Sequence, residues 1–448
     1  MSAERLRSGP LARGVRRAAS LLASRPARGA LLGLALVQLA RLAGSLAPPD
    51  VYGKDFRQEY CLARAFLDGQ PLYESLVEQA RRYVGSDLAP LPSPSAHPPS
   101  VATLFVPLAL LPYRVATTAW LVGNLGLLVY GLRLLAHSLG WRPRAEALAL
   151  LASAALLWPP VLSDLLHGQL TTALLVCIVG SWSALRAGRA TLAGLWLGLG
   201  AAIKLLPLLL IPWLLLGRRW RTAAVAVAVF TLLNLPPVLR LGAGLWPDYL
   251  LHVAPQVAAT YQDKMLNLSL YGLIVRHTVG YAFVRPLLAA PTGLLTVLAD
   301  ATVLLLALVL AAVYGQHAER DAFDLAWSVL VVAMLLGSPV TWPMSCVLLL
   351  LPIAVFARGF LERRPFAGTP GARHVLVLVG VAVPADTLMS AAAGVAAVGG
   401  WVPGAPLPGA AALVLSLPNL ALLLAFGIVC GALVRAAAAG PLTSPLRD

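Results

Sequence analysis

The chain has 448 residues, of which 59% are hydrophobic and only 12% are charged, and its mean hydropathy is +0.80. Soluble globular proteins carry about 25% charged residues, so the composition excludes a soluble protein and predicts an all-α, polytopic helical membrane protein. The formal net charge of +15 does not indicate a nucleic-acid partner, because the arginines fall in short loops between apolar segments, as expected of cytoplasmic loops.

Long apolar runs predict about a dozen helices that cross or enter the membrane. A bilayer core about 30 Å thick needs roughly 20 apolar residues per helix, and fewer where a helix is short or re-entrant. We therefore expect about 11–13 transmembrane or re-entrant helices, the segment 100–136 being too long for a single crossing. The expected segments are 29–47, 100–136, 145–162, 169–186, 190–203, 205–217, 220–239, 287–314, 323–337, 340–357, 374–396 and 410–434.

The placement of arginine predicts which helix ends face the cytoplasm. Residues 1–28 hold seven arginines and are expected to form a basic, cytoplasmic N-terminal tail. Residues 29–434 then form a single integral-membrane domain, and residues 435–448 form a cytoplasmic C-terminal tail. The two longest polar stretches, 48–99 and 240–286, become external loops. A multi-pass protein of the inner or plasma membrane is expected.

This orientation limits the chemistry available to the protein. Polar residues beside apolar segments are costly and usually functional, and here they gather on the external face, where no nucleotide sugar or ATP is available. Synthetic chemistry there needs an activated donor carried in the membrane, and a polyprenyl-phosphate sugar is the obvious one. The chain has no P-loop, GxGxxG, HExxH or GxSxG motif, which argues against a pump or an enzyme with a cytosolic donor.

Asp55, in the first external loop, is the strongest catalytic candidate. The apolar spacing over residues 56–69 predicts an amphipathic helix lying in the membrane interface. Asp55 then lies at or just before the start of this helix, where a carboxylate acts either as a cap of free backbone amides or as a general base towards an acceptor hydroxyl. Glu59 lies one turn further on the same face, as a substrate ligand or a solvated charge.

Two short polar motifs supply further candidate substrate-binding residues. His97 precedes two prolines at the start of the second hydrophobic segment, and either binds a phosphate or lies at the interface without a ligand. Gln169 follows Gly168 at the outer join of two spans, where glycine permits a tight turn. The Gln169 amide either bonds sugar hydroxyls or belongs to a helix cap.

Lys204 interrupts two short apolar runs with a single cation. A charge in the middle of an isolated span costs at least about 2.5–3.5 kcal/mol, whereas at the outer end of a hairpin the cost is much smaller. The alternatives are an ammonium that snorkels to the surface and one that holds a lipid phosphate beside an external cavity. The second interpretation is favoured.

Two later polar groups are candidates for lining a substrate groove. Asn267 and Ser269 lie in the second long external loop, and Trp342 ends the motif Ser338-Pro339-Val340-Thr341-Trp342. The four cysteines show no CxxC spacing, so the sequence indicates neither a disulfide framework nor a metal site.

Taken in order, these motifs resemble one family over residues 50 to 357. They are Lys54-Asp55-Phe56, Gly69-Gln70-Pro71-Leu72-Tyr73, His97-Pro98-Pro99, Pro107-Leu108-Ala109-Leu110-Leu111-Pro112, Gly168-Gln169, Ala201-Ala202-Ile203-Lys204-Leu205-Leu206-Pro207, Asn267-Leu268-Ser269-Leu270-Tyr271-Gly272 and the motif ending at Trp342. The family is glycosyltransferase family 87, of the integral-membrane glycosyltransferase-C superfamily, which includes polyprenyl-phosphate-mannose-dependent α-mannosyltransferases and some arabinofuranosyltransferases.

The resemblance implies an inverting transfer of a hexose, with mannose as the expected sugar, from a polyprenyl-phosphate donor to a lipid or glycan acceptor, without a metal or other cofactor. In the family an aspartate of the first external loop is the base, which carries onto Asp55, and basic residues hold the donor phosphate, which points to Lys204. The chain departs from the family at Met344 and Ser345, where an acidic residue and histidine are often found.

Two other functions stay open at this point. A transporter or flippase of lipid-linked sugars would use the same lipid, although the polar groups gather on one face rather than along a path through the membrane. An inactive relative acting as a partner subunit is suggested by Met344 and Ser345.

Overall fold

The computed structural model describes residues 24–85, 93–261, 264, 266–280, 291–315, 320–372, 385–400, 402, 408–409 and 411–439. Every regular element in these ranges is a helix. In chain order they are α3 (Arg25–Gly44), η1 (Asp50–Gly53), α4 (Arg57–Asp68), α5 (Leu76–Tyr83), α6 (Ser100–Leu104), α7 (Val106–Ala109), α8 (Tyr113–Ser138), α9 (Ala145–Leu156), α10 (Pro159–His167), α11 (Thr171–Arg186), α12 (Ala190–Ile203), η2 (Leu206–Leu209), α13 (Leu210–Leu216), α14 (Trp220–Leu241), α15 (Leu245–Asp248), η3 (Tyr249–Val253), α16 (Ala254–Tyr261), α17 (Leu270–Thr278), α18 (Thr292–Gly315), α19 (Arg320–Leu336), η4 (Pro343–Leu349), α20 (Leu350–Glu362), η5 (Pro365–Gly368), α22 (Ala385–Val398), α23 (Ala411–Leu415) and α24 (Leu417–Ala438).

The all-α, polytopic membrane fold expected from the composition is confirmed. Within the described ranges, six helices are long and apolar enough to cross a membrane: α3, α8, α14, α18, the continuous η4–α20 and α24. Helices α9 and α10 form a seventh candidate that is bent by 80° at the break between them. The shorter apolar helices are α11, α12 and η2–α13, and the long segment 100–136 divides into α6, α7 and most of α8.

The centre of the bundle is formed by α19 and α11, which are buried along almost their whole length. Three tryptophans fill the space between them and their neighbours. Trp213 meets Trp327 edge-to-face with ring centroids 5.6 Å apart, and its indole N–H donates to Ala311 O. Trp182 donates to Asp324 Oδ1. Since buried indole groups usually find a hydrogen-bond partner, these two bonds fix the rings of Trp213 and Trp182 in the core.

Helices α12 and α14 pack closely because glycine removes the side chain between them. A Cβ atom added at Gly194 would lie 2.6 Å from Thr222 O, and one added at Gly198 would lie 2.5 Å from Ala226 O. Glycines four residues apart allow this backbone approach between membrane helices. The pairing holds the middle of α12 against α14; one end of α12 leads into Lys204 and the other into the turn that follows α11.

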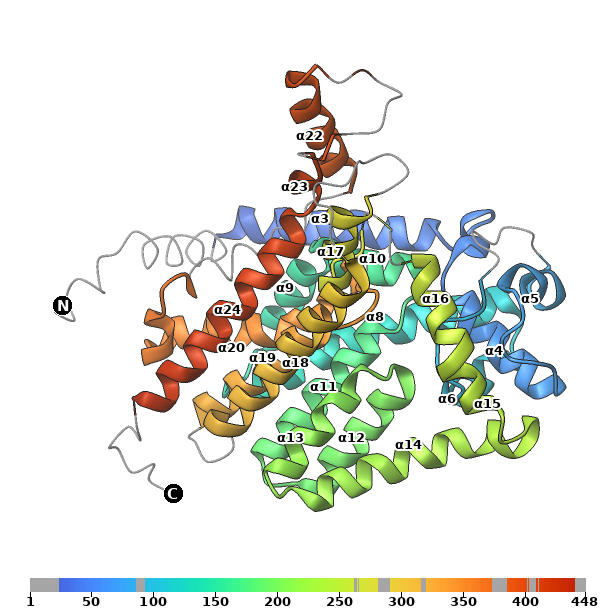
Figure 1. The fold of residues 1–448 in the computed structure, drawn as a ribbon, viewed down its shortest axis with the longest axis horizontal. Coiled ribbons are helices and arrows are strands. Elements are labelled where there is room, and N and C mark those ends of the chain that lie inside the picture. The colour runs from blue at the N-terminus through green and yellow to red at the C-terminus, as the bar shows by residue number, and fades with distance from the viewer. Residues whose placement is uncertain are drawn as a thin grey trace.

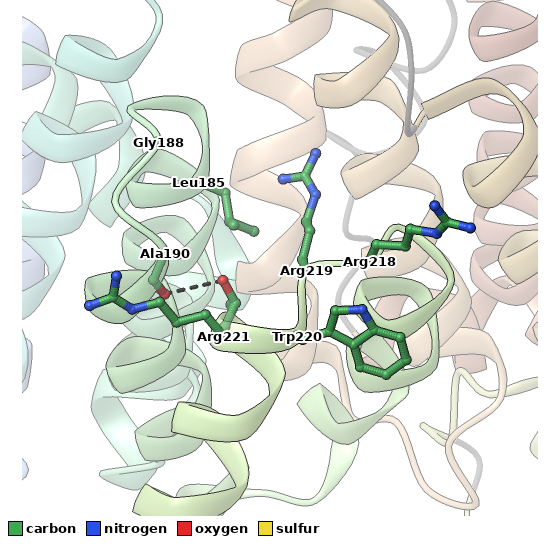
Figure 2. A pocket seen from close by; sticks show the side chains of 8 residues that line it. Leu185, Gly188, Ala190, Arg218, Arg219, Trp220 and Arg221 are labelled. Atoms are coloured by element: carbon green, nitrogen blue, oxygen red, sulfur yellow. Dashed lines mark hydrogen bonds between the residues drawn. The ribbon is translucent and has the colours of Figure 1, made fainter.

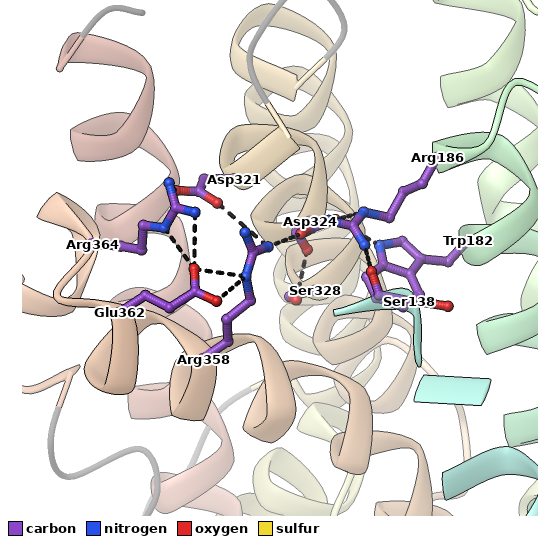
Figure 3. Close-up of polar contacts among 9 residues, drawn as sticks. All are labelled: Ser138, Trp182, Arg186, Asp321, Asp324, Ser328, Arg358, Glu362 and Arg364. Carbon is purple, nitrogen blue, oxygen red and sulfur yellow. Dashed lines mark hydrogen bonds and ion pairs between the residues drawn. The ribbon is translucent and has the colours of Figure 1, made fainter. Parts of the chain in front are cut away.

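The two ends of the bundle differ in character (Figure 1). The short helices α4, α5, α15 and α16 gather at one end. Away from these helices, arginines of α11 and α20 converge on the acidic residues of α19 (Figure 3): Arg186 Nε lies 2.9 Å from Asp324 Oδ1, and Arg358 Nη1 lies 3.3 Å from Asp324 Oδ2. Arg364 joins the same network through Asp321 and Glu362. The end of α11, helix α20 and the segment after it are thus joined to the start of α19 by ion pairs.

We expect Gly198→Ala to lower the free energy of unfolding by about 1–3 kcal/mol, as overpacking usually does, because its methyl group meets the α14 backbone. Thermal unfolding of the purified protein in detergent measures the change. Gly123→Ala in α8 is the matched control, since a Cβ atom there has open space around it. Equal unfolding temperatures for the two variants would contradict the packing described.

Candidate functional site

The turn that carries Asp55 is held against the C-terminal end of α10. The Asp55 backbone N–H donates to His167 O over 2.8 Å. The Lys54 ammonium donates to Leu166 O over 2.6 Å and to Ser45 Oγ over 2.8 Å. Burial lowers the pKa of Lys54, and the two bonds satisfy the ammonium inside the protein. Lys54 therefore positions the turn and does not face a ligand.

Gly168 allows α10 to end directly beside this turn. Its φ is +70°, the left-handed conformation that favours glycine at a helix C-terminus, and an added Cβ atom would lie 3.0 Å from Phe56 Cβ. Phe56 is buried and stacks on Trp120 with ring centroids 5.9 Å apart. Trp120 Nε1 in turn donates to Gly168 O. The turn and the end of α10 thus form one packed unit.

The carboxylate of Asp55 has one oxygen bonded and one open. Gln169 Nε2 donates to Asp55 Oδ2 over 2.7 Å, and Gln169 is fixed by the Asn124 amide, which donates to Gln169 O. Among the described residues no donor bonds Asp55 Oδ1. The side chain does not cap α4, which begins at Arg57 with Phe56 in the cap position and no side-chain capping bond. Of the two roles open to Asp55, the cap is wrong.

The residue that caps the helix after Gln169 is Asp164, and not Gln169 itself. This carboxylate is fully buried and accepts the backbone N–H groups of Thr171 and Thr172, the first two residues of α11, together with the Thr172 hydroxyl. It therefore satisfies amide groups that would otherwise lack partners at the start of a buried helix. The Gln169 side chain is left to bond Asp55, a contact between residues 114 positions apart.

Lys204 lies where α12 ends, in extended backbone conformation. It is half-buried, and within the described part of the chain its ammonium forms no hydrogen bond. The carboxylates of Asp164, Glu59 and Asp55 all lie within electrostatic range of this ammonium. The structure thus brings Lys204 and Asp55 into one region. Within the described part of the chain, the Lys204 ammonium has no hydrogen-bonded partner there.

Glu59 and His97 form a buried pair beside this region. Glu59 is 0% exposed and His97 is 4% exposed, and Glu59 Oε1 lies 2.8 Å from His97 Nε2 without the alignment of a hydrogen bond. The interpretation of Glu59 as a solvated charge is therefore wrong. The His97 carbonyl accepts the Tyr73 hydroxyl, so neither residue of the pair lies at a free surface.

Asn267 and Ser269 are committed to internal hydrogen bonds, and the structure does not present them to a groove. Asn267 Oδ1 accepts the N–H groups of Ser269 and Thr341, and its Nδ2 donates to Pro339 O. Ser269 Oγ caps α17 by accepting the Gly272 N–H. Both side chains are fully buried and join two distant loops, and the expectation that they bind substrate stays a prediction.

Trp342 is half-buried, and its ring meets Tyr261 edge-to-face with centroids 5.7 Å apart. The η4 helix that follows it contains Met344 and Ser345, both buried, and packs against α10. The position at which the family often has a histidine therefore lies inside the protein, behind the helix whose end holds Asp55.

The fold and this group of residues define an all-helical integral-membrane protein with a carboxylate and an ammonium at the ends of two of its apolar helices. The model of glycosyltransferase family 87 matches residues 96–339, more than half of the chain. The chain belongs to this family. The matched range includes His97, Gln169 and Lys204, while Asp55 lies before it.

Curated relatives agree with the family. The chain is 34% identical over 150 residues to the polyprenol-phosphate-mannose-dependent α-(1-2)-phosphatidylinositol pentamannoside mannosyltransferase of Mycolicibacterium smegmatis, covering 33% of this chain and 36% of the relative. It is 29% identical over 233 residues to the polyprenol-phosphate-mannose-dependent α-(1-2)-phosphatidylinositol mannoside mannosyltransferase of Mycobacterium tuberculosis, covering 49% and 52%. The matches thus span between a third and about half of the relatives' length.

We expect Asn267→Ala to lower the free energy of unfolding by about 2–4 kcal/mol, because it leaves the buried N–H groups of Ser269 and Thr341 without their partner. Denaturant unfolding in detergent measures this loss. Asn234→Ala is the control, since among the described residues Asn234 Nδ2 bonds only Phe230 O of its own helix, and its removal should cost less than half as much. A stable Asn267→Ala protein with a raised KM would instead support a role of Asn267 in substrate binding.

Proposed function

We propose that this protein is a membrane glycosyltransferase that moves mannose from a polyprenyl-phosphate donor to a lipid or glycan acceptor on the external face of the membrane. The membership of glycosyltransferase family 87 supports the reaction class, and the names of the two relatives support the donor. The single observation that carries the assignment of the site is the Asp55 carboxylate, with one oxygen held by Gln169 and the other open.

In this mechanism Asp55 Oδ1 accepts the proton of the acceptor hydroxyl as the hydroxyl oxygen attacks the anomeric carbon of the sugar. A new bond forms between that oxygen and the carbon, while the bond from the carbon to the phosphate oxygen breaks and its electron pair leaves with polyprenyl phosphate. Attack from the side opposite the phosphate inverts the anomeric configuration. The hydrogen bond that the Gln169 amide donates to Asp55 Oδ2 fixes the orientation of the carboxylate before the reaction.

Lys204 is assigned to the phosphate of the donor. A lone ammonium without a hydrogen bond to the described residues can bind the phosphate oxygens and stabilise the charge that develops there on departure. Glu59 and His97 lie beside Lys204, and we assign this pair to the positioning of the ammonium. We assign Trp342, which precedes the helix η4 that packs against α10, to contacts with the substrate.

Asp55→Asn should lower kcat by about 10²–10⁴-fold, the usual contribution of a general base, while the fold is retained. The measurement is the release of polyprenyl phosphate from polyprenyl-phosphate mannose with a phosphatidylinositol mannoside acceptor. Asp50→Asn is the control, because Asp50 lies on the same loop and is exposed. Full activity of Asp55→Asn would exclude Asp55 as the base.

Lys204→Gln should raise the KM for the donor on the order of tenfold, as expected when a charge-assisted contact to phosphate is lost, with a smaller effect on the KM for the acceptor. Steady-state kinetics with each substrate varied in turn separates the two effects. An unchanged donor KM would remove Lys204 from the phosphate site.

The same assay with the wild-type protein decides between the enzyme and the other two functions. Formation of a mannosidic bond excludes an inactive partner subunit. Movement of labelled donor between the leaflets of a liposome without any new glycosidic bond would instead support a flippase. A screen of polyprenyl-phosphate mannose, arabinose and glucose identifies the donor sugar.

A further inference from the structure

A second polar region lies at the opposite end of α12 from Lys204. The loop between α13 and α14 meets the turn between α11 and α12 there, and together they border a cavity of about 440 Å³ that is widely open to the surface. Leu185, Gly188 and Ala190 line one side, and residues 218–222 line the other (Figure 2). The 14 residues of α12 separate this cavity from Lys204 by about 21 Å, at 1.5 Å per residue.

The lining of the cavity is strongly and only positively charged. Arg218, Arg219 and Arg221 line it, with no acidic residue among its lining residues. Figure 2 shows Arg219 extending beside Leu185, with Arg218 and Arg221 on the two flanks. Within the part of the chain that the structure describes, none of these arginines forms an ion pair, unlike the arginines that surround Asp324.

Arg219 is the most informative of the three. It is half-buried, and its guanidinium lies 4.9 Å from the centroid of the Phe323 ring and 5.3 Å from that of Trp213. Burial lowers the pKa of Arg219, with no carboxylate offsetting the effect. Since a partly desolvated charge is costly unless it is paired, an anion in the cavity would relieve this cost.

The surroundings of the cavity are those of a membrane interface. Trp220 and Leu216 are each 61% exposed and flank the arginines in sequence. Exposed tryptophan beside basic residues is characteristic of the boundary between hydrocarbon and headgroups, and basic pockets between membrane helices bind anionic headgroups. Apolar side chains next to the charges also provide a surface for acyl chains.

We propose that this cavity binds the phosphate of an anionic phospholipid headgroup. The arginines contact the phosphate oxygens, and Trp220 and Leu216 contact the upper part of the acyl chains. The site lies at the opposite end of α12 from Lys204, and the proposal does not depend on the glycosyltransferase reaction.

The test is the binding of short-chain phosphatidylglycerol to the purified full-length protein in detergent, measured by native mass spectrometry, with phosphatidylcholine and inorganic phosphate as the comparison ligands. R218Q/R221Q should weaken phosphatidylglycerol binding on the order of tenfold or more, given the usual contribution of each basic residue near an anionic headgroup. R142Q/R144Q is the matched control, because Arg142 and Arg144 are an exposed pair in another arginine-rich loop. R219Q tests the half-buried charge alone.

Weaker binding by R218Q/R221Q and R219Q, with R142Q/R144Q unchanged and phosphatidylcholine bound poorly throughout, supports the proposal. If R218Q/R221Q and R142Q/R144Q weakened phosphatidylglycerol binding equally, the effect would come from overall charge and the proposed site would be wrong. Binding that no variant weakens would also overturn the site. Displacement of phosphatidylglycerol by inorganic phosphate at comparable concentration would overturn the lipid as the source of the phosphate. Unchanged helicity and elution volume of each variant exclude misfolding as the cause.

Discussion

The site depends on one contact, between the turn at Lys54 and Asp55 and the last carbonyl groups of α10. The final carbonyls of a helix lack partners within it, and here the Asp55 N–H and the Lys54 ammonium bond His167 O and Leu166 O. These bonds close the end of α10 and at the same time fix Asp55 beside Gln169. A requirement of the fold and a requirement of the proposed chemistry are therefore met by the same few atoms.

The remaining parts of the site are positioned by helix packing rather than by polar bonds. Gly194 and Gly198 bring α12 against α14, and this pairing determines where Lys204 emerges. Asp164 holds the start of α11, which keeps Gln169 in place. The polar residues thus lie at the ends of rigid apolar helices, an arrangement that holds functional groups more firmly than loops do.

Much of this architecture could be predicted from the sequence, because an apolar run long enough to span a membrane has few conformations open to it other than a helix. The location of Asp55 before an amphipathic helix and of Lys204 between two apolar runs also followed from local spacing. Pairings between distant segments could not be predicted. Glu59 looks like a surface charge on its own helix, but the packing of α4 against other helices buries it, with His97 at 2.8 Å.

The same limit explains the loop at Asn267. In the sequence, a short polar motif looks the same whether its side chains line a groove or bond a second loop. The partners of Asn267, at Pro339 and Thr341, lie more than seventy residues away along the chain. The Gln169 contact with Asp55 crosses 114 positions. In both cases the residue type indicated a role, and only the fold determined which role it was.

The length of α12 has a consequence for the depth of the site. With its arginine end at one boundary of the hydrocarbon, a helix of 14 residues reaches about 21 Å into a layer about 30 Å thick. Lys204 then lies roughly 9 Å below the opposite boundary, and deeper still if the helix is tilted. In the proposed mechanism the donor phosphate would have to descend from the headgroup layer to meet Lys204. An acceptor sugar would then have to enter below the membrane surface, where bulk water competes less for the hydroxyl that Asp55 is proposed to deprotonate.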